Sequence, residues 1–207
     1  MIINSTFKTV CFTGPRPDRL LGFNNINNYE PIIQTVYNLC EKMYLLGYHN
    51  FISGAAQGFD MLAFQAIERL KNRRPDIKNI VYIPFKAHGS LWPEHGIFSK
   101  DELAKMLKKA DLVKCISSAD IGKIDKETAA VLLNARNEAM VNDSDKIIAL
   151  YPDGTWLNTE HSGTANCMRY AKMQMKDIYQ IRYNILDKTK KFSNIKVTAI
   201  LNAPDAL

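Results

Sequence analysis

The chain has 207 residues, of which 46% are hydrophobic and 23% charged, and its net charge is +6. This length fits one domain of ordinary size with a sizeable core, and the composition is that of a globular protein. No apolar run has the length of a membrane span, and the N-terminus lacks the basic start and apolar stretch of a signal peptide, so we expect a cytoplasmic protein without a membrane partner.

Short runs rich in β-branched and aromatic residues predict strands, which in chain order are Thr9–Thr13, Asn50–Ser53, Asn79–Pro84, Leu112–Ile116, Lys146–Tyr151 and Ile178–Tyr183. Apolar residues at helical spacing predict helices between the strands, marked by Ile32 to Met43, Phe64 to Leu70, Leu103 to Leu107, and Leu132 to Ala139. Strand–helix alternation with nearly all-apolar strands predicts a parallel sheet covered on both faces. We therefore expect a Rossmann-like three-layer α/β/α domain over residues 1–183, with all of these strands central except Leu112–Ile116 and Ile178–Tyr183.

Residues 184–207 fit this alternation poorly, and we expect either an extra strand at Ile195–Leu201 or a loose tail of the same domain. The last 39 residues hold eight Lys or Arg against three Asp or Glu, including Lys188, Lys190 and Lys191. Such a cluster could contact nucleic acid, although it is more often a solvated face.

The residue types that usually bind metals show no suitable arrangement. The four cysteines stand far apart without metal-ligand spacing, and the four histidines form no cluster (Cys11, Cys40, Cys115 and Cys167; His49, His88, His95 and His161). We expect reduced thiols, no metal, no cofactor and no assembled catalytic group.

The loop after the first predicted strand reads TGPRPDR, from Thr13 to Arg19. Gly14 permits a tight exit from the strand, and the flanking prolines stiffen the loop around Arg16. An arginine held in this way suits bidentate capture of a phosphate or carboxylate, whereas the simpler interpretation is a surface turn with a solvated arginine.

The loop after the second predicted strand lies in the stretch FISGAAQGFD, residues 51–60. Gly54 and Gly58 allow backbone conformations closed to other residues, and Asp60 falls in the first turn of the next helix. The free amides of that turn could bind an anion, or the small residues could simply allow close packing of helix against strand. A glycine pair alone does not decide between these interpretations.

Two further segments favour an anion site. Ser162, Gly163 and Thr164 open a helix and offer amides and hydroxyls at its positive end. Arg136 and Asn137 lie on or beside the apolar stripe of the helix around Leu132 to Ala139. A charge in that position needs a partner, which is either a protein carboxylate or a ligand anion.

Taken in order, these motifs resemble the SLOG superfamily, and within it the YpsA-like branch: TGPR, SGAAQGFD, a strand ending in PF followed by Trp92, RNEAMVNDSD before a strand, and SGT opening a helix. The resemblance covers roughly residues 8–183. It implies a ligand- and phosphate-binding site made of Thr13, Gly14, Arg16, Ser53, Gly54, Gly58, Asp60, Trp92, Arg136, Asn137, Ser162, Gly163 and Thr164. The stretch around Gly54 is also similar to the DNA-processing protein DprA.

The sequence departs from the family pattern at three positions. Ala55 stands where YpsA-like sequences usually have glycine or methionine, and Ser162 replaces the first of two adjacent glycines. Lonely-guy-type phosphoribohydrolases carry a catalytic glutamate in P-G-G-x-G-T-x-x-E, and the matching position here is Cys167.

These observations favour a protein that senses or sequesters a nucleotide or ADP-ribose-derived ligand without turnover. One alternative is an N-glycosidic hydrolase acting on nucleoside 5′-monophosphates, with Asp60 or Glu160 in place of the missing acid. Another is a DprA-like protein that binds single-stranded DNA through the basic C-terminal region. The sequence also leaves homo-oligomer formation open.

Overall fold

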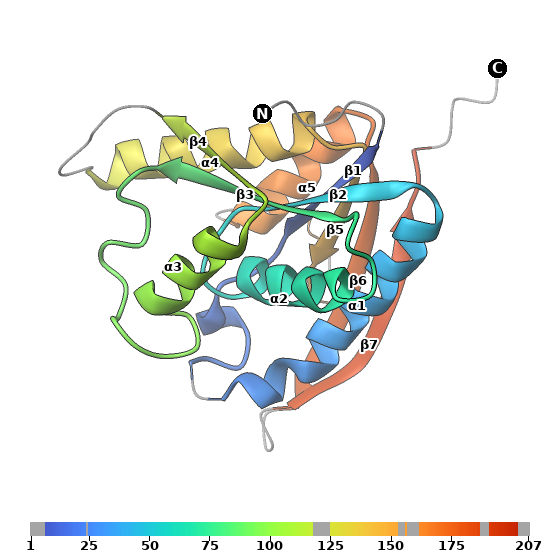
Figure 1. Ribbon diagram of the computed structural model, residues 1–207, viewed down its shortest axis with the longest axis horizontal. Helices are drawn as coiled ribbons and strands as arrows, with labels where there is room; N and C mark the ends of the chain where they lie inside the picture. The colour runs from blue at the N-terminus through green and yellow to red at the C-terminus, as the bar shows by residue number, and fades with distance from the viewer. Residues whose placement is uncertain are drawn as a thin grey trace.

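The computed structural model describes residues 7–23, 25–117, 125–152, 156, 162–186 and 191–202. Its strands form one sheet in the order β4-β3-β2-β1-β5-β6-β7 (Figure 1). Their bounds are β1 (Lys8–Thr13), β2 (Tyr48–Ser53), β3 (Lys78–Phe85), β4 (Leu112–Ser117), β5 (Lys146–Leu150), β6 (Asp177–Leu186) and β7 (Lys191–Ile200). The helices are α1 (Glu30–Leu45), α2 (Phe59–Lys71), α3 (Lys100–Lys109), α4 (Lys126–Asn142) and α5 (Gly163–Met173), with short 3₁₀ turns η1 (Pro17–Arg19) and η2 (Ile26–Tyr29).

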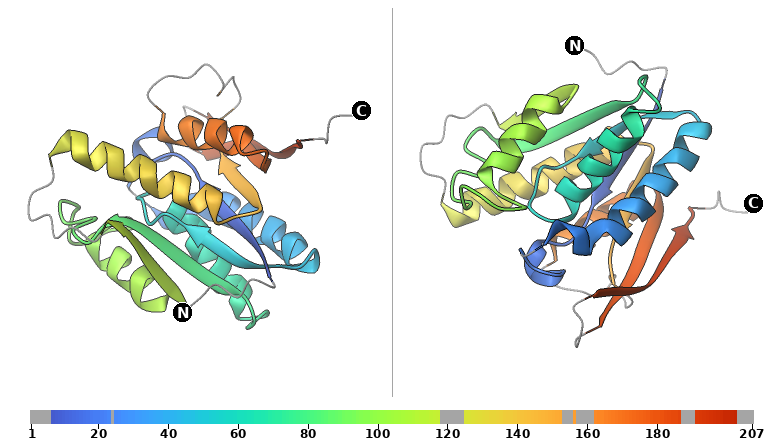
Figure 2. Two further views of the ribbon diagram at one scale, coloured as in Figure 1. Left: turned by 90° about the horizontal axis from the view of Figure 1, so that it is seen from above. Right: turned by 60° about the horizontal axis from the view of Figure 1, so that its bottom comes forward.

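Helices cover both faces of this sheet. Helices α1, α2 and α3 pack on one face, and α4 and α5 pack on the other (Figure 2). Each face has its own apolar core, with Phe12 and Phe51 in the first and Ile52 and Ile147 in the second. The predicted Rossmann-like three-layer architecture is confirmed.

The strands predicted to be central are central. β3, β2, β1 and β5 lie next to one another inside the sheet, and all pairs from β4 to β6 are parallel. Strands buried on both faces need apolar side chains on both sides, which explains the near-continuous runs Val10–Phe12 and Ile147–Leu150. Helix ends also follow local signals, since Gly47 adopts a φ of +87° just beyond α1.

The C-terminal region adds an antiparallel strand to the sheet. β6 continues through Leu186, beyond the predicted end of that strand at Tyr183, and β7 pairs with it in antiparallel fashion. β7 begins at Lys191 rather than at Ile195, because the Phe192 ring packs against the rings of Tyr183 and Tyr29. Lys188 and Lys190 lie outside the described residues.

The strand order reverses between β1 and β5. From β1 the chain first builds the sheet toward β4, and it then returns to β5 on the other side. In open α/β sheets, ligands bind in the crevice at the carboxyl ends of the strands beside such a reversal. The topology therefore directs attention to the loops that follow Thr13 and Leu150.

All four cysteines lie in the described part of the chain. Cys11, Cys40 and Cys167 are buried free thiols and Cys115 is an exposed one. No helix in the described ranges combines the length and hydropathy needed to cross a bilayer.

Candidate ligand-binding site

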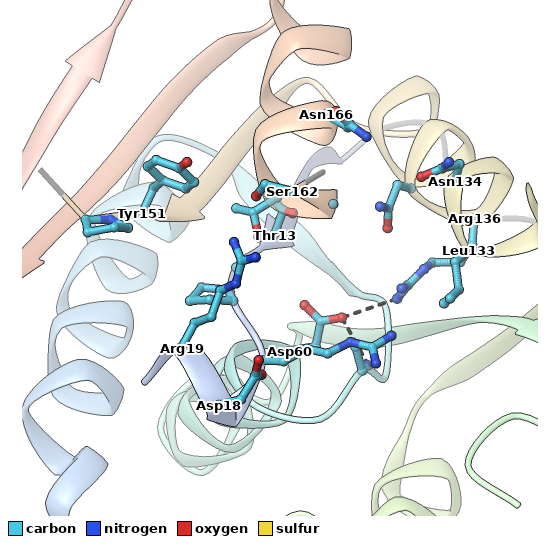
Figure 3. Close-up of a pocket in the computed structure, with 18 of the residues that line it drawn as sticks. Thr13, Asp18, Arg19, Asp60, Leu133, Asn134, Arg136, Tyr151, Ser162 and Asn166 are labelled. Atoms are coloured by element: carbon cyan, nitrogen blue, oxygen red, sulfur yellow. Dashed lines mark hydrogen bonds and ion pairs between the residues drawn. The ribbon is translucent and has the colours of Figure 1, made fainter. Parts of the chain in front are cut away.

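A pocket of about 610 Å³ opens at the carboxyl edge of β1 and β5 (Figure 3). This volume lies within the range of small-molecule sites. The walls come from the loop after β1, the pocket-facing side of α4, the start of α5 and the ends of β5 and β6. The lining residues are Thr13, Gly14, Pro15, Arg16, Asp18, Arg19, Ala56, Asp60, Ala130, Leu133, Asn134, Arg136, Asn137, Tyr151, Pro152, Ser162, Gly163, Thr164, Asn166 and Tyr183.

The loop after β1 presents two arginines to this pocket. Arg16 has an extended backbone and precedes η1, which closes with hydrogen bonds from the Arg19 amide to the Arg16 carbonyl (3.0 Å) and from the Gly22 amide to the Pro17 carbonyl (2.9 Å). Both arginine side chains are exposed, and neither makes an ion pair with another residue that the structure describes. In Figure 3 the Arg19 guanidinium extends toward Thr13 and Ser162. A short, hydrogen-bonded turn thus holds two cations that form no ion pair with the residues that the structure describes.

The first turn of α5 supplies the opposite wall. The Ser162 hydroxyl caps the helix by accepting a hydrogen bond from the Ala165 amide at 3.2 Å. A side-chain carbon added at Gly163 would meet no atom of the described residues within 4 Å, so these residues leave the space in front of this turn open. The amides of Gly163 and Thr164 lie at the positive end of the helix dipole, where an anion is favoured.

A buried ion pair forms the floor of the pocket. Arg136 and Asp60 are 4% and 6% exposed, and Arg136 Nη1 lies 3.2 Å from Asp60 Oδ2. Asp60 Oδ2 also accepts a hydrogen bond from the Ala56 amide at 3.1 Å, and Arg136 Nη1 donates to the Gly54 carbonyl. Burial raises the pKa of Asp60 and lowers the pKa of Arg136, while the charge of each partner opposes the shift on the other. The sequence left open whether Arg136 pairs with a protein carboxylate or with a ligand anion, and in the structure its partner is the carboxylate of Asp60.

The glycines of both loops are needed for this packing. A side-chain carbon at Gly54 would overlap the Arg136 guanidinium and lie 2.7 Å from Asp60 Oδ2. Gly58 has a φ of +92°, and a carbon there would lie 2.6 Å from the Pro15 carbonyl oxygen. At Gly14 the same addition would overlap the Phe59 ring. These three positions let the two loops and α4 approach one another, which is the packing interpretation of the glycine-rich stretch.

Four of the residues implied by the resemblance do not line the pocket: Ser53, Gly54, Gly58 and Trp92. Ser53 is fully buried at the end of β2. Trp92 stacks edge-on against the His88 ring at 5.1 Å, and His88 Nε2 donates a hydrogen bond to the Ala55 carbonyl at 3.0 Å. Trp92 therefore contacts the glycine-rich loop through His88. The other nine, Thr13, Gly14, Arg16, Asp60, Arg136, Asn137, Ser162, Gly163 and Thr164, meet in the one pocket.

Sequence reasoning missed several lining residues. Tyr183 lies two residues past the parallel pairing of β6 with β5, and its hydroxyl donates a hydrogen bond to the Arg19 carbonyl at 3.3 Å. Tyr151 ends a predicted strand at the correct edge of the sheet, and this position could have indicated it. Asn134 precedes Asn137 by three residues and so shares its helix face. Asn166 lies one turn after Ser162. Tyr183, Asn134 and Asn166 become apparent only when β6, α4 and α5 are placed against the β1 loop.

We predict that Gly54→Ala destabilises the fold. The methyl group displaces Arg136 from Asp60, and breaking a buried ion pair typically costs about 3–5 kcal/mol. Urea denaturation followed by circular dichroism measures this loss. Gly163→Ala is the matched control, because its methyl group enters open space. Equal unfolding midpoints for wild type and Gly54→Ala would contradict the proposed role of this glycine.

We also predict that His88 makes stability depend on pH. Burial lowers the pKa of His88 from 6.5 to about 4, so between these values the unfolded chain binds the proton more readily than the folded one. Stability then rises as the pH increases from 4 to 6.5, with a contribution of about 3 kcal/mol from this residue. Urea unfolding of wild type and His88→Gln across this range isolates the contribution. Parallel stability curves for the two proteins would show that His88 does not make it.

Comparisons with known proteins give the family of this chain. The model of the YspA SLOG family, which carries the name YpsA, matches residues 10–186. The SPbeta prophage-derived protein YoqJ of Bacillus subtilis (strain 168) is 34% identical over 128 residues, which cover 60% of this chain and 70% of that protein. The family match spans most of the chain, including every loop that lines the pocket. The chain therefore belongs to the YpsA-like family of SLOG proteins.

Proposed function

We propose that this protein binds a small nucleotide or ADP-ribose-derived ligand through its phosphate, as a sensor or a sequestering module, without turnover. The observation that carries the proposal is the meeting of Arg16, Arg19 and the first turn of α5 in one pocket at the strand-order reversal. Guanidinium groups and free helix amides both favour phosphate oxygens. The pocket also has the volume of a small-molecule site.

The charge distribution supports an anionic ligand. Arg136 is neutralised by Asp60 in the pocket floor, whereas Arg16 and Arg19 have no ion-pair partner among the described residues. Arg136 Nε is buried and also lacks a hydrogen-bond partner in that part of the chain. A buried donor of this kind is costly unless a ligand or water satisfies it. The pocket thus offers more donors and more positive charge than the described residues satisfy.

The states of Asp60 and Cys167 support binding without turnover. The Asp60 carboxylate accepts hydrogen bonds from Arg136 and from the Ala56 amide. Cys167 occupies the position of the catalytic glutamate in the resembling phosphoribohydrolases. It is buried, and burial raises the pKa of its thiol to about 11, so it is a neutral thiol at physiological pH.

The second candidate function is an N-glycosidic hydrolase. It is favoured by one observation, that Asp60 lines the pocket and burial raises the pKa of its carboxyl group, as a general acid requires. Glu160, the other acid considered, lies outside the described residues. Single-stranded DNA binding is a weaker candidate, because the exposed Lys191 and Lys196 belong to β7 and do not line the pocket.

We predict that Arg16→Ala and Arg19→Ala each weaken ligand binding about tenfold to a hundredfold, because a charge-assisted hydrogen bond contributes roughly 1.5–3 kcal/mol. Thermal-shift screening against nucleoside mono- and diphosphates, ADP-ribose and cyclic dinucleotides identifies the ligand, and calorimetry then measures its affinity. Arg73→Ala is the control, since Arg73 is an exposed arginine that does not line the pocket. Undiminished affinity in Arg16→Ala would refute the phosphate site.

We further predict that the protein releases no ribose 5-phosphate from nucleoside 5′-monophosphates above the rate in buffer alone. Chromatographic detection of free base and ribose 5-phosphate after prolonged incubation provides the measurement. Release by the wild type that disappears in an Asp60→Asn variant whose circular dichroism spectrum matches wild type would establish the hydrolase instead. The two functions are separated by this experiment even if both proteins bind the nucleotide equally.

A further inference from the structure

We propose that Asn134, Asn137 and Asn166 determine the specificity of this pocket by recognising an uncharged donor–acceptor group of the ligand. We call these residues the amide wall. The recognised group is the base edge or the sugar hydroxyls of a nucleotide. The inference rests on the proposed function and extends it from the phosphate to the remainder of the ligand.

The amide wall lies on two neighbouring helices. On α4, the residues Ala130, Leu133, Asn134 and Asn137 follow the i, i+3, i+4, i+7 spacing of one helix face, and all of them line the pocket. Asn166 lies on α5, the helix that packs beside α4. Figure 3 shows Asn134 and Asn166 on neighbouring turns of these helices at the rim of the pocket. The wall therefore combines apolar carbon with neutral amides.

Two asparagines of α4, Asn134 and Asn137, have no hydrogen-bond partner among the described residues. Asn134 is exposed and Asn137 is half-buried, and neither side chain makes a hydrogen bond to any residue that the structure describes. Asparagine is also a poor helix former, because its side chain competes for backbone groups. By contrast, the Asn166 amide oxygen accepts a hydrogen bond from Arg169, which leaves its NH₂ group for a ligand. The side-chain carbonyl and NH₂ groups of Asn134 and Asn137 can therefore both form hydrogen bonds with a ligand.

The chemistry of the pocket is divided between its walls. The unpaired cations, Arg16 and Arg19, come from the β1 loop, and the open amides come from the start of α5. A phosphate accepts hydrogen bonds only and suits the space between these two walls. A carboxamide offers a donor and an acceptor together, which matches a base edge or a hydroxyl. The α4 side therefore suits the uncharged part of the ligand, and its apolar residues suit the face of a ring.

Calorimetry with four probes tests this division: AMP, 2′-deoxy-AMP, ribose 5-phosphate and inorganic phosphate. The variants are Asn134→Leu and Asn137→Leu, which keep the side-chain size and improve helix propensity. Glu138→Gln is the control on the same helix, because Glu138 is exposed and does not line the pocket. Arg16→Ala serves as the comparison that removes a phosphate contact.

We expect wild type to bind AMP more tightly than inorganic phosphate. Each leucine variant should bind AMP about threefold to tenfold more weakly and inorganic phosphate equally well, as expected for losing one neutral hydrogen bond. Arg16→Ala should weaken both probes. Variants that lose affinity for AMP but not for 2′-deoxy-AMP identify the 2′-hydroxyl as the recognised group. Leucine variants that bind ribose 5-phosphate as wild type does, but bind 2′-deoxy-AMP more weakly, identify the base edge as the recognised group.

Three results would overturn the inference. The leucine variants could bind AMP as tightly as wild type does, or they could lose affinity for AMP and for inorganic phosphate by the same factor. The wild type could also bind AMP no more tightly than inorganic phosphate. In each of them, binding that depends on Arg16 would leave the proposed function standing. Failure of the proposed function has a different signature, since neither AMP nor inorganic phosphate, nor any nucleotide of the thermal-shift panel, would then bind.

Discussion

The buried ion pair between Asp60 and Arg136 is the interaction on which the pocket depends. It joins the first turn of α2 to α4, and the Gly54 carbonyl in the preceding loop accepts a further hydrogen bond from the same guanidinium. Removing two charges from water is costly, and the pair is tolerated because its contacts compensate that cost. The side chain missing at Gly54 makes room for the guanidinium. With Arg136 neutralised in this way, the positive charge available to a ligand comes from Arg16 and Arg19.

The β1 loop is held in place by the same glycine-rich segment. The Phe59 amide donates a hydrogen bond to the Pro15 carbonyl at 3.2 Å, and Gly58 allows the two backbones to approach this closely. On the other side, His88 donates to the carbonyl of Ala55, a non-glycine residue with a φ of +56°. Backbone strain of this kind persists where surrounding contacts determine it. The arginines are thus presented by a loop whose neighbours fix its position before any ligand arrives.

The sequence was sufficient for most of the fold, because buried parallel strands require apolar runs and helices leave a periodic pattern. It was less informative at Lys191–Ser193, where pairing with β6 and ring packing of Phe192 extend a strand beyond its local signal. At the site, the motif order found Arg16, Asp60, Arg136 and the start of α5. It could not distinguish a glycine that faces a ligand from one that faces Arg136, since both need the same missing side chain. Nor could it find Tyr183, whose place in the pocket depends on the packing of β6 beside the β1 loop.

We expect a ligand phosphate to bind between the β1 loop and the first turn of α5, above an ion pair that stays intact. A crystal structure of the protein with AMP would locate the phosphate. We predict phosphate oxygens within hydrogen-bonding distance of the Arg16 guanidinium and of the Gly163 and Thr164 amides, with Asp60 still paired to Arg136. A phosphate bound elsewhere, or one that takes Arg136 away from Asp60, would contradict it.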